Sequence, residues 1–285
     1  MEIIEGVAMH IGRILANYGI KSNADKNADL IKALGSNDSE QIKQALTSLE
    51  QSVESLTKEQ IFQAFSSVQK LTKSNVKDVQ IAAISLMLKI ASKKAVPPDL
   101  SRGTLFFCEQ TMDTLTTLLA QDKNPEVRTA AAKGLSYTLQ VLKTHFYDKP
   151  SQAENFQAKN FSFITISLND KEKKVQNEML ALIKEIGPSL KDDDKKALLL
   201  NLTEKLEKAV NFGDTKEITD LLIGIQKLTP NGSDIEKNFS TVYEKINAVV
   251  KELLNKEKEK KNPSPYIQAL ASEVQKTAKY IVPKL

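Results

Sequence analysis

The 285-residue chain has few of the residues that form turns, cross-links and metal sites. It contains 10 glycines, 9 prolines, one cysteine, two histidines and no tryptophan. Because strand-rich chains of this length need many turn residues, the scarcity of Gly and Pro favours helices. The single cysteine excludes an intrachain disulfide and a four-cysteine zinc site. We interpret Cys108, within TLFFCEQTM, as a small buried hydrophobic residue.

Long apolar runs are also missing, and the charge is nearly balanced. No segment approaches the ~20 apolar residues of a membrane span. The start, MEIIEGVAMHIGR, carries Glu2 and Glu5 where a secretory signal would carry Lys or Arg. We therefore expect a cytoplasmic protein, although a bacterial effector exported by a dedicated machine would look the same. The net charge of +4 is too small to indicate nucleic acid unless the cations cluster on one face.

Residues suited to catalysis or metal binding do not form a recognisable set. His10 and His145 lie far apart, and neither has a second histidine at metal-ligand spacing. We interpret His145 as a charge partner at a helix end rather than a catalytic base. Glycine-rich phosphate loops and a G-x-S-x-G motif are absent from the sequence. The prediction is a protein that is not an enzyme, with no catalytic residues, no cofactor and no metal.

The stretch DKNPEVRTAAAKGLSYTLQVL, residues 122–142, predicts the start and the buried face of a helix. Asn124 is a favourable N-cap, Pro125 suits the first helical position, and Glu126 complements the positive helix end. Apolar or small residues then recur with a helical period from Val127 to Leu142. The small residues among them let a neighbouring helix approach closely.

The same pattern recurs along the chain. The anchors Val79, Val127 and Val175 are 48 residues apart (127 − 79 and 175 − 127), and weaker copies begin at Ile42 and Ile218. Recurrence at roughly 40–47 residues, with one helix pair per unit, is typical of a helical solenoid. We therefore expect an all-α chain of about six helix pairs and an extra helix over residues 1–18.

The segments between the anchors predict the other helix of each pair. We place these helices at residues 58–73, 104–121, 156–168 and 195–210. Capping-box patterns mark helix starts at Thr57, Ser151, Asp214 and Ser233, each followed three residues later by Gln or Glu. The expected organisation is an N-terminal capping segment (1–36), a repeat array (37–230) and a C-terminal capping helix pair (231–285).

The residues DKNPEVRTAAAKGL resemble the second helix of a HEAT repeat. Positions that match the family pattern are Asp122, Pro125, Val127, Arg128, Ala131, Ala132, Gly134 and Leu135. The copies at 79 and 175 keep the apolar pattern but have Gln80 and Gln176 in place of the Arg. The resemblance implies a right-handed α-α superhelix of the HEAT/armadillo-like type. It also implies that Asp122 and Arg128 form polar links between adjacent repeats.

In HEAT-like arrays the second helices line the concave face, and such arrays mostly act as binding scaffolds. Equivalent positions would then form ladders: Gln80, Arg128 and Gln176; Ser85, Lys133 and Ala181; Lys89, Tyr137 and Glu185. The resemblance therefore implies a protein partner bound on the concave face. The predicted partner-binding residues are Lys89, Arg128, Lys133, Tyr137, Gln176 and Glu185.

Two other functions remain open from the sequence. A nucleic-acid-binding protein of the HEAT-like alkylated-base glycosylase type would need a strongly basic, aromatic groove, and only 6% of residues here are aromatic. Nucleic acid is thus not the expected partner, and we expect a monomer. An effector delivered to a host cell is compatible with the composition. A further candidate binding segment is HFYDKPSQAENF, residues 145–156, whose aromatics alternatively cover the end of the core.

Overall fold

The computed structural model describes residues 22–92, 101–145, 164, 167–187, 190, 192–228 and 236–281. Three expected segments lie outside these ranges. They are the helix at residues 1–18, the candidate binding segment 145–156 apart from the backbone of His145, and most of the helix at 156–168. The chain divides into two compact units, Met1–Tyr147 and Asp148–Leu285, called here the N-terminal and C-terminal units. Each unit is described by itself.

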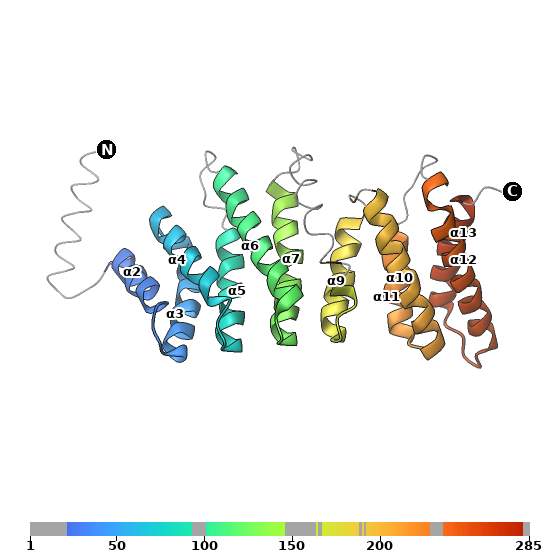
Figure 1. The fold of residues 1–285 in the computed structure, drawn as a ribbon, viewed down its shortest axis with the longest axis horizontal. Helices are drawn as coiled ribbons and strands as arrows, with labels where there is room; N and C mark the ends of the chain where they lie inside the picture. Colours follow the sequence, from blue (N-terminus) through green and yellow to red (C-terminus); the bar gives the residue numbers. More distant parts are fainter. Residues whose placement is uncertain are drawn as a thin grey trace. The chain divides into compact units, whose positions relative to one another are not determined.

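The N-terminal unit is a stack of three helix pairs (Figure 1). The pairs are α2 (Asn23–Ala33) with α3 (Ser39–Ser52), α4 (Lys58–Leu71) with α5 (Lys77–Ala91), and α6 (Ser101–Gln121) with α7 (Pro125–His145); the short 3₁₀ helix η1 (Val53–Ser55) follows α3. The second helices α3, α5 and α7 pack side by side, and α2 packs against α4. The unit therefore has two layers, one of first helices and one of second helices.

The C-terminal unit repeats this arrangement. Its helices are α9 (Lys173–Ile186), α10 (Asp192–Phe212), α11 (Thr215–Leu228), α12 (Glu236–Glu259) and α13 (Pro265–Ile281). The pairs are α10 with α11 and α12 with α13, while α9, α11 and α13 pack in series as second helices. Residues 164, 167 and 168, ahead of α9, are also helical. Helix pairs are thus the building unit of both halves, as the sequence predicts.

The repeated anchor residues lie in the core between the two layers. Val79, Val127, Val175 and Ile218 are each at most 1% exposed, and Ile42 is also buried. Because each anchor starts the buried stripe of a second helix, its burial fixes which face of that helix packs against the first-helix layer. The spacing found in the sequence therefore marks equivalent positions of successive helix pairs.

Local signals place the helix starts correctly. Thr57 and Gln60 form the expected reciprocal capping box, with Thr57 Oγ1 accepting from Gln60 N at 3.3 Å and Gln60 Oε1 accepting from Thr57 N at 3.1 Å. Asn124 Oδ1 accepts from Glu126 N at 2.9 Å. Asp214 Oδ1 accepts from Glu217 N at 3.0 Å, but the Glu217 carboxylate pairs with Lys173. The candidate caps at Ser151 and Ser233 lie outside the described residues.

A close approach of three helices surrounds Gly134 on α7. A Cβ atom at this position would lie 2.8 Å from Leu115 Cδ1 of α6 and 3.2 Å from Leu88 Cδ1 of α5. Such distances are shorter than normal carbon–carbon contacts. The sequence prediction that small residues in this helix allow a neighbour to approach is confirmed at Gly134.

Cys108 lies fully buried on α6, as expected, with its Sγ 3.7 Å from the carbonyl oxygen of Ala91. Burial raises the pKa of the thiol to about 12, with a smaller contribution from Glu109. A protonated thiol in this position packs as a small apolar side chain.

The all-α prediction is confirmed, since none of the described ranges contains a strand. A membrane-spanning helix would need a long apolar stretch, and no helix in the described ranges has one.

Candidate functional site

The position directly after each of the three anchors Val79, Val127 and Val175 closes the turn within its own helix pair. Gln80 Nε2 donates to Thr72 O at 3.1 Å, and Arg128 Nη1 donates to Asp122 O at 3.0 Å and Lys123 O at 3.1 Å. Gln176 Nε2 donates to Asp170 O. These bonds satisfy carbonyl groups between the two helices. The predicted ladder of Gln80, Arg128 and Gln176 is therefore a structural position with a repeated role.

One member of this ladder does not face solvent, although the ladder was expected to line the concave face. Gln80 is buried, and its Nε2 atom also donates to Asp122 Oδ2 at 2.9 Å. Asp122 belongs to the next helix pair, so its predicted link between adjacent repeats is present. Arg128 uses its guanidinium to hold the backbone of its own turn, which the sequence did not predict.

Removing the Asp122 carboxylate should weaken the contact between the second and third helix pairs. In Asp122→Ala, Gln80 Nε2 loses a half-buried acceptor, and the backbone N–H of Asn124, 2.8 Å from Asp122 Oδ1, loses its acceptor on the same carboxylate. We expect a loss of about 1–3 kcal/mol in unfolding free energy. Urea denaturation of wild type, Asp122→Ala and the exposed control Asp113→Ala measures this. Equal stability of the first two proteins would show that the link is energetically neutral.

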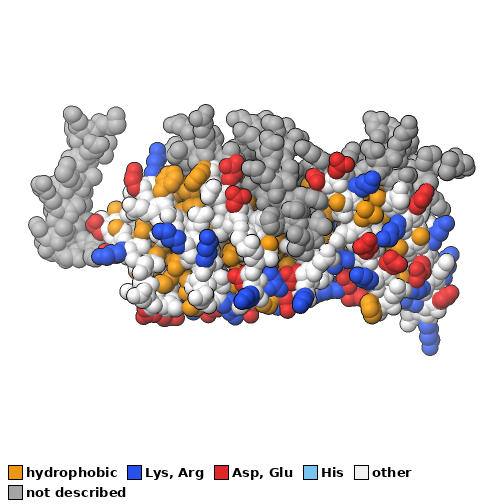
Figure 2. Space-filling model, viewed as in Figure 1, with side chains coloured by type: hydrophobic (Ala, Val, Ile, Leu, Met, Phe, Trp, Pro, Cys, Tyr) orange, Lys and Arg blue, Asp and Glu red, His pale blue; other side chains and the backbone are white. Residues whose placement is uncertain are grey.

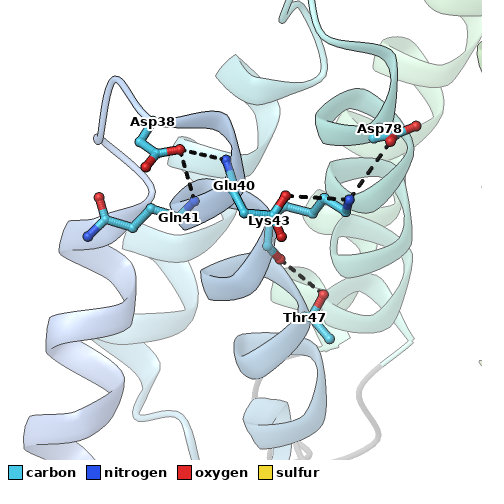
Figure 3. Close-up of polar contacts among 6 residues, drawn as sticks. All are labelled: Asp38, Glu40, Gln41, Lys43, Thr47 and Asp78. Carbon is cyan, nitrogen blue, oxygen red and sulfur yellow. Dashed lines mark hydrogen bonds and ion pairs between the residues drawn. The ribbon is translucent and has the colours of Figure 1, made fainter.

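Ion pairs connect the second helices near their N-terminal ends. Lys43 of α3 lies 3.8 Å from Asp78 of α5 and 3.7 Å from Glu40 of its own helix, as Figure 3 shows. Lys77 of α5 lies 2.8 Å from Glu126 of α7. The hydrogen bond that Lys77 donates to the Glu126 carboxylate, together with the negative charge of Glu126, raises the pKa of Lys77. Because these groups are exposed, the ion pairs add little to the free energy of folding. Their main effect is to favour one alignment of the neighbouring helices over others.

The C-terminal unit carries equivalent pairs. Lys173 of α9 pairs with Glu217 and lies 3.7 Å from Asp214 at the start of α11. Lys184 of α9 pairs with Asp220 of α11 at 2.9 Å. Burial lowers the pKa of nearby Lys205, and the charge of Glu217 opposes that shift. In both units, lysines of one second helix thus contact carboxylates of the next.

Three of the six predicted partner-binding residues lie exposed on the second-helix layer of the N-terminal unit. Lys89 is on α5, and Lys133 and Tyr137 are on α7. Tyr137 has 44% of its surface exposed, and Lys89 occupies the equivalent position of the neighbouring helix. Ser85, which is equivalent to Lys133, instead donates to Glu50 Oε1 of α3 at 2.8 Å. We name Lys89, Lys133 and Tyr137 the second-helix ladder.

The other predicted residues are distributed differently. Arg128 is half-buried over its turn, and Gln176 and Glu185 belong to α9 of the C-terminal unit. The side chain of Glu185 lies outside the described residues, and Ala181 is exposed. Within one unit, the structure therefore brings together only the residues of α5 and α7.

A group of aromatic residues on the first-helix layer was not predicted as a site. Phe62 and Phe65 of α4 contact Phe107 of α6, with ring centroids 5.0 and 4.8 Å apart. Phe62 and Phe106 are exposed, although they flank buried core positions. A sequence signal did exist, because both residues fall one position away from the apolar stripe of their helix.

Metal chemistry has no candidate site in the parts of the chain that the structure describes. No group of three or more His, Cys, Asp or Glu side chains there is arranged to hold an ion.

Comparison with known proteins agrees with the helix-pair architecture. The HEAT repeat family model matches residues 112–142, which span much of α6 and α7. This is the region in which the sequence resembles a HEAT repeat. A search of curated proteins finds no matching sequence.

Solved structures with this fold include designed repeat proteins. An engineered structural-genomics target matches with a TM-score of 0.56 and 19% identity, over 90% of this chain and 98% of that chain. A designed armadillo repeat protein matches with a TM-score of 0.54 and 17% identity, over 88% and 98% of the two chains. Another, in complex with the peptide (KR)4, matches with a TM-score of 0.55 and 17% identity over the same shares. The chain therefore has a HEAT/armadillo-like repeat fold, as its sequence predicts.

Proposed function

We propose that this protein is a non-catalytic scaffold that binds a segment of a partner protein on its second-helix layer. The observation that carries the proposal is the second-helix ladder, where Tyr137 and two lysines are exposed at repeated positions of α5 and α7. Tyrosine is a favoured interface residue because it combines a large apolar ring with a polar group. Protein binding is common in this fold, and a designed armadillo repeat protein has been solved with a bound peptide.

The charges of this layer favour acidic residues in the partner. Asp78 and Glu126, near the N-terminal ends of α5 and α7, are paired with lysines of the preceding helices. Lys89 forms no ion pair with a described residue, and Lys133 is exposed one turn before Tyr137. The peptide (KR)4 is basic, so we expect this chain to prefer a different peptide chemistry from that designed protein.

Position-specific crosslinking tests the proposal. A photoreactive residue at position 89 or 137 should capture a partner that the same residue at position 63, an exposed site on α4, does not capture. With that partner purified, Tyr137→Ala/Lys133→Glu should weaken binding by on the order of ten-fold or more, because an anchor and a favourable charge are both lost. Isothermal titration calorimetry measures the affinities.

A matched control has two exposed substitutions away from α5 and α7, Gln63→Ala and Lys32→Glu. It should bind the partner with wild-type affinity. Unchanged binding by Tyr137→Ala/Lys133→Glu would place the partner site elsewhere and overturn the proposal.

A further inference from the structure

The first-helix layer of the N-terminal unit carries an aromatic surface held in place by the core. Phe65 and Phe107 are buried, and the ring of Phe107 lies 5.0 Å from Phe62 and 5.6 Å from Phe106. Phe62 and Phe106 lie 6.5 Å apart and are 52% and 45% exposed. Packing against buried rings restricts the exposed rings, so a ligand would lose little side-chain entropy in contacting them.

Two carboxylates extend this surface along α6. Glu109 and Asp113 are exposed and follow Phe106 by three and seven residues, which places all three on one side of the helix. Neither carboxylate forms an ion pair with a described residue, in contrast to the paired acids of the second-helix layer. Figure 2 shows hydrophobic side chains next to acidic side chains on the N-terminal unit.

The exposed lysines of α4 do not cancel this negative charge. Lys58 lies at the first position of α4 beside the exposed Glu59, and Lys70 lies in the last turn. Between them α4 presents Phe62, Gln63 and Ser66 to solvent, all of which are uncharged. The middle of the layer is therefore aromatic on α4 and both aromatic and acidic on α6.

We propose that Phe62, Phe106, Glu109 and Asp113, named the first-helix patch, bind a basic amphipathic segment of another protein. In this segment a hydrophobic side chain packs on the two phenylalanines. A Lys or Arg about one to two helical turns away pairs with Glu109 or Asp113. The electron-rich faces of the phenylalanine rings also attract cations. This surface and its preference for basic residues are separate from the second-helix ladder, which favours acidic residues.

A pair of synthetic peptides tests the patch in the full-length protein. One is a labelled amphipathic peptide of about 14 residues with Leu on one face and Lys or Arg beside it, and the other has Glu in place of each cation. Fluorescence anisotropy should show saturable binding of the basic peptide only. Glu109→Lys/Asp113→Lys should weaken this binding by on the order of ten-fold, because favourable pairs become repulsive. Phe62→Gln/Phe106→Gln should weaken it to a similar extent.

Two control variants distinguish binding at the first-helix patch from non-specific electrostatic attraction of a cationic peptide to the protein. Glu40→Lys/Glu54→Lys makes the same change in net charge at exposed positions on α3 and η1, and it should leave the affinity unchanged. Tyr137→Ala/Lys133→Glu should also leave it unchanged. Equal weakening by the Glu40/Glu54 variant, or equal binding of the acidic peptide, would overturn the proposal.

Self-association provides a second readout. Analytical ultracentrifugation should show the same association state for wild type and Phe62→Gln/Phe106→Gln. Dimerisation of wild type that this variant abolishes would mean that a second copy occupies the patch, contrary to the proposal.

Discussion

Gly134→Val should destabilise the N-terminal unit by about 2–3 kcal/mol. Even a Cβ alone would lie 2.8 Å from Leu115 Cδ1 and 3.2 Å from Leu88 Cδ1, and valine adds two methyl groups. Leu115 is fully buried, so it has little room to move aside. Replacing glycine normally stabilises a helix by up to about 1 kcal/mol. The overlap between helices should outweigh this gain.

A double-mutant cycle tests whether contact with Leu115 causes the destabilisation of Gly134→Val. Leu115→Ala alone should cost about 2–5 kcal/mol by leaving a cavity, but Gly134→Val can fill part of that cavity. The double variant should therefore be more stable than the sum of the single effects predicts, by about 1–2 kcal/mol. Urea denaturation gives the free energies, and hydrogen exchange of α6 and α7 localises the change.

The exposed Ala181 of α9 supplies the control, since Ala181→Val should cost only the small helix-propensity difference of valine. Strictly additive effects of Gly134→Val and Leu115→Ala would show that the two sites are not in contact in solution.

The sequence predicts those parts of the fold that depend on local pattern. The anchors Val79, Val127 and Val175 were identifiable because burial on one side of a helix imposes a 3.6-residue period. The Thr57–Gln60 cap was identifiable because donor and acceptor lie three residues apart. The close approach at Gly134 followed from a run of small residues within a single helix.

Features that depend on partners distant in sequence were not predicted. Gln80 is polar, but it is buried because Thr72 and Asp122 provide acceptors from two different turns. The ion pair between Lys77 and Glu126 depends on how two helices align. A sequence pattern for one helix contains no information about that alignment. The first-helix patch also depends on the alignment of two helices, since it forms only where α4 and α6 lie side by side.

The candidate binding site was predictable only in part. Equivalent positions of second helices were predicted from the repeat, and Lys89, Lys133 and Tyr137 are indeed exposed on one layer. Whether a repeated polar residue faces solvent or closes a turn depends on the carbonyl groups within its reach. Arg128 and Gln176 both reach such carbonyls in the turn before their helix.

Replacing the buried Glu257 of α12 should destabilise the C-terminal unit by about 2–3 kcal/mol. Its side chain is 0% exposed, and its carboxylate accepts from Ser264 N at 2.9 Å and pairs with Lys260. These contacts hold the turn between α12 and α13. In Glu257→Ala the amide of Ser264 and the ammonium of Lys260 lose this acceptor. Glu259→Ala, which removes the same charge from an exposed position, should change stability by less than about 0.5 kcal/mol.

The pH dependence of this effect gives a second test. Burial acts to raise the pKa of Glu257, but hydrogen bonds from Lys260 and the Ser264 amide outweigh it and hold the pKa below its ordinary value of 4.5. A carboxyl group with a lowered pKa stabilises the fold fully above its unfolded pKa and loses that contribution as the pH falls through its folded pKa. The stability difference between wild type and Glu257→Gln should therefore be constant near neutral pH and shrink below about pH 4.5. Urea midpoints measured from neutral to acidic pH test this, and a difference that stays constant or grows on acidification would mean that the carboxylate does not hold the turn as a charged group.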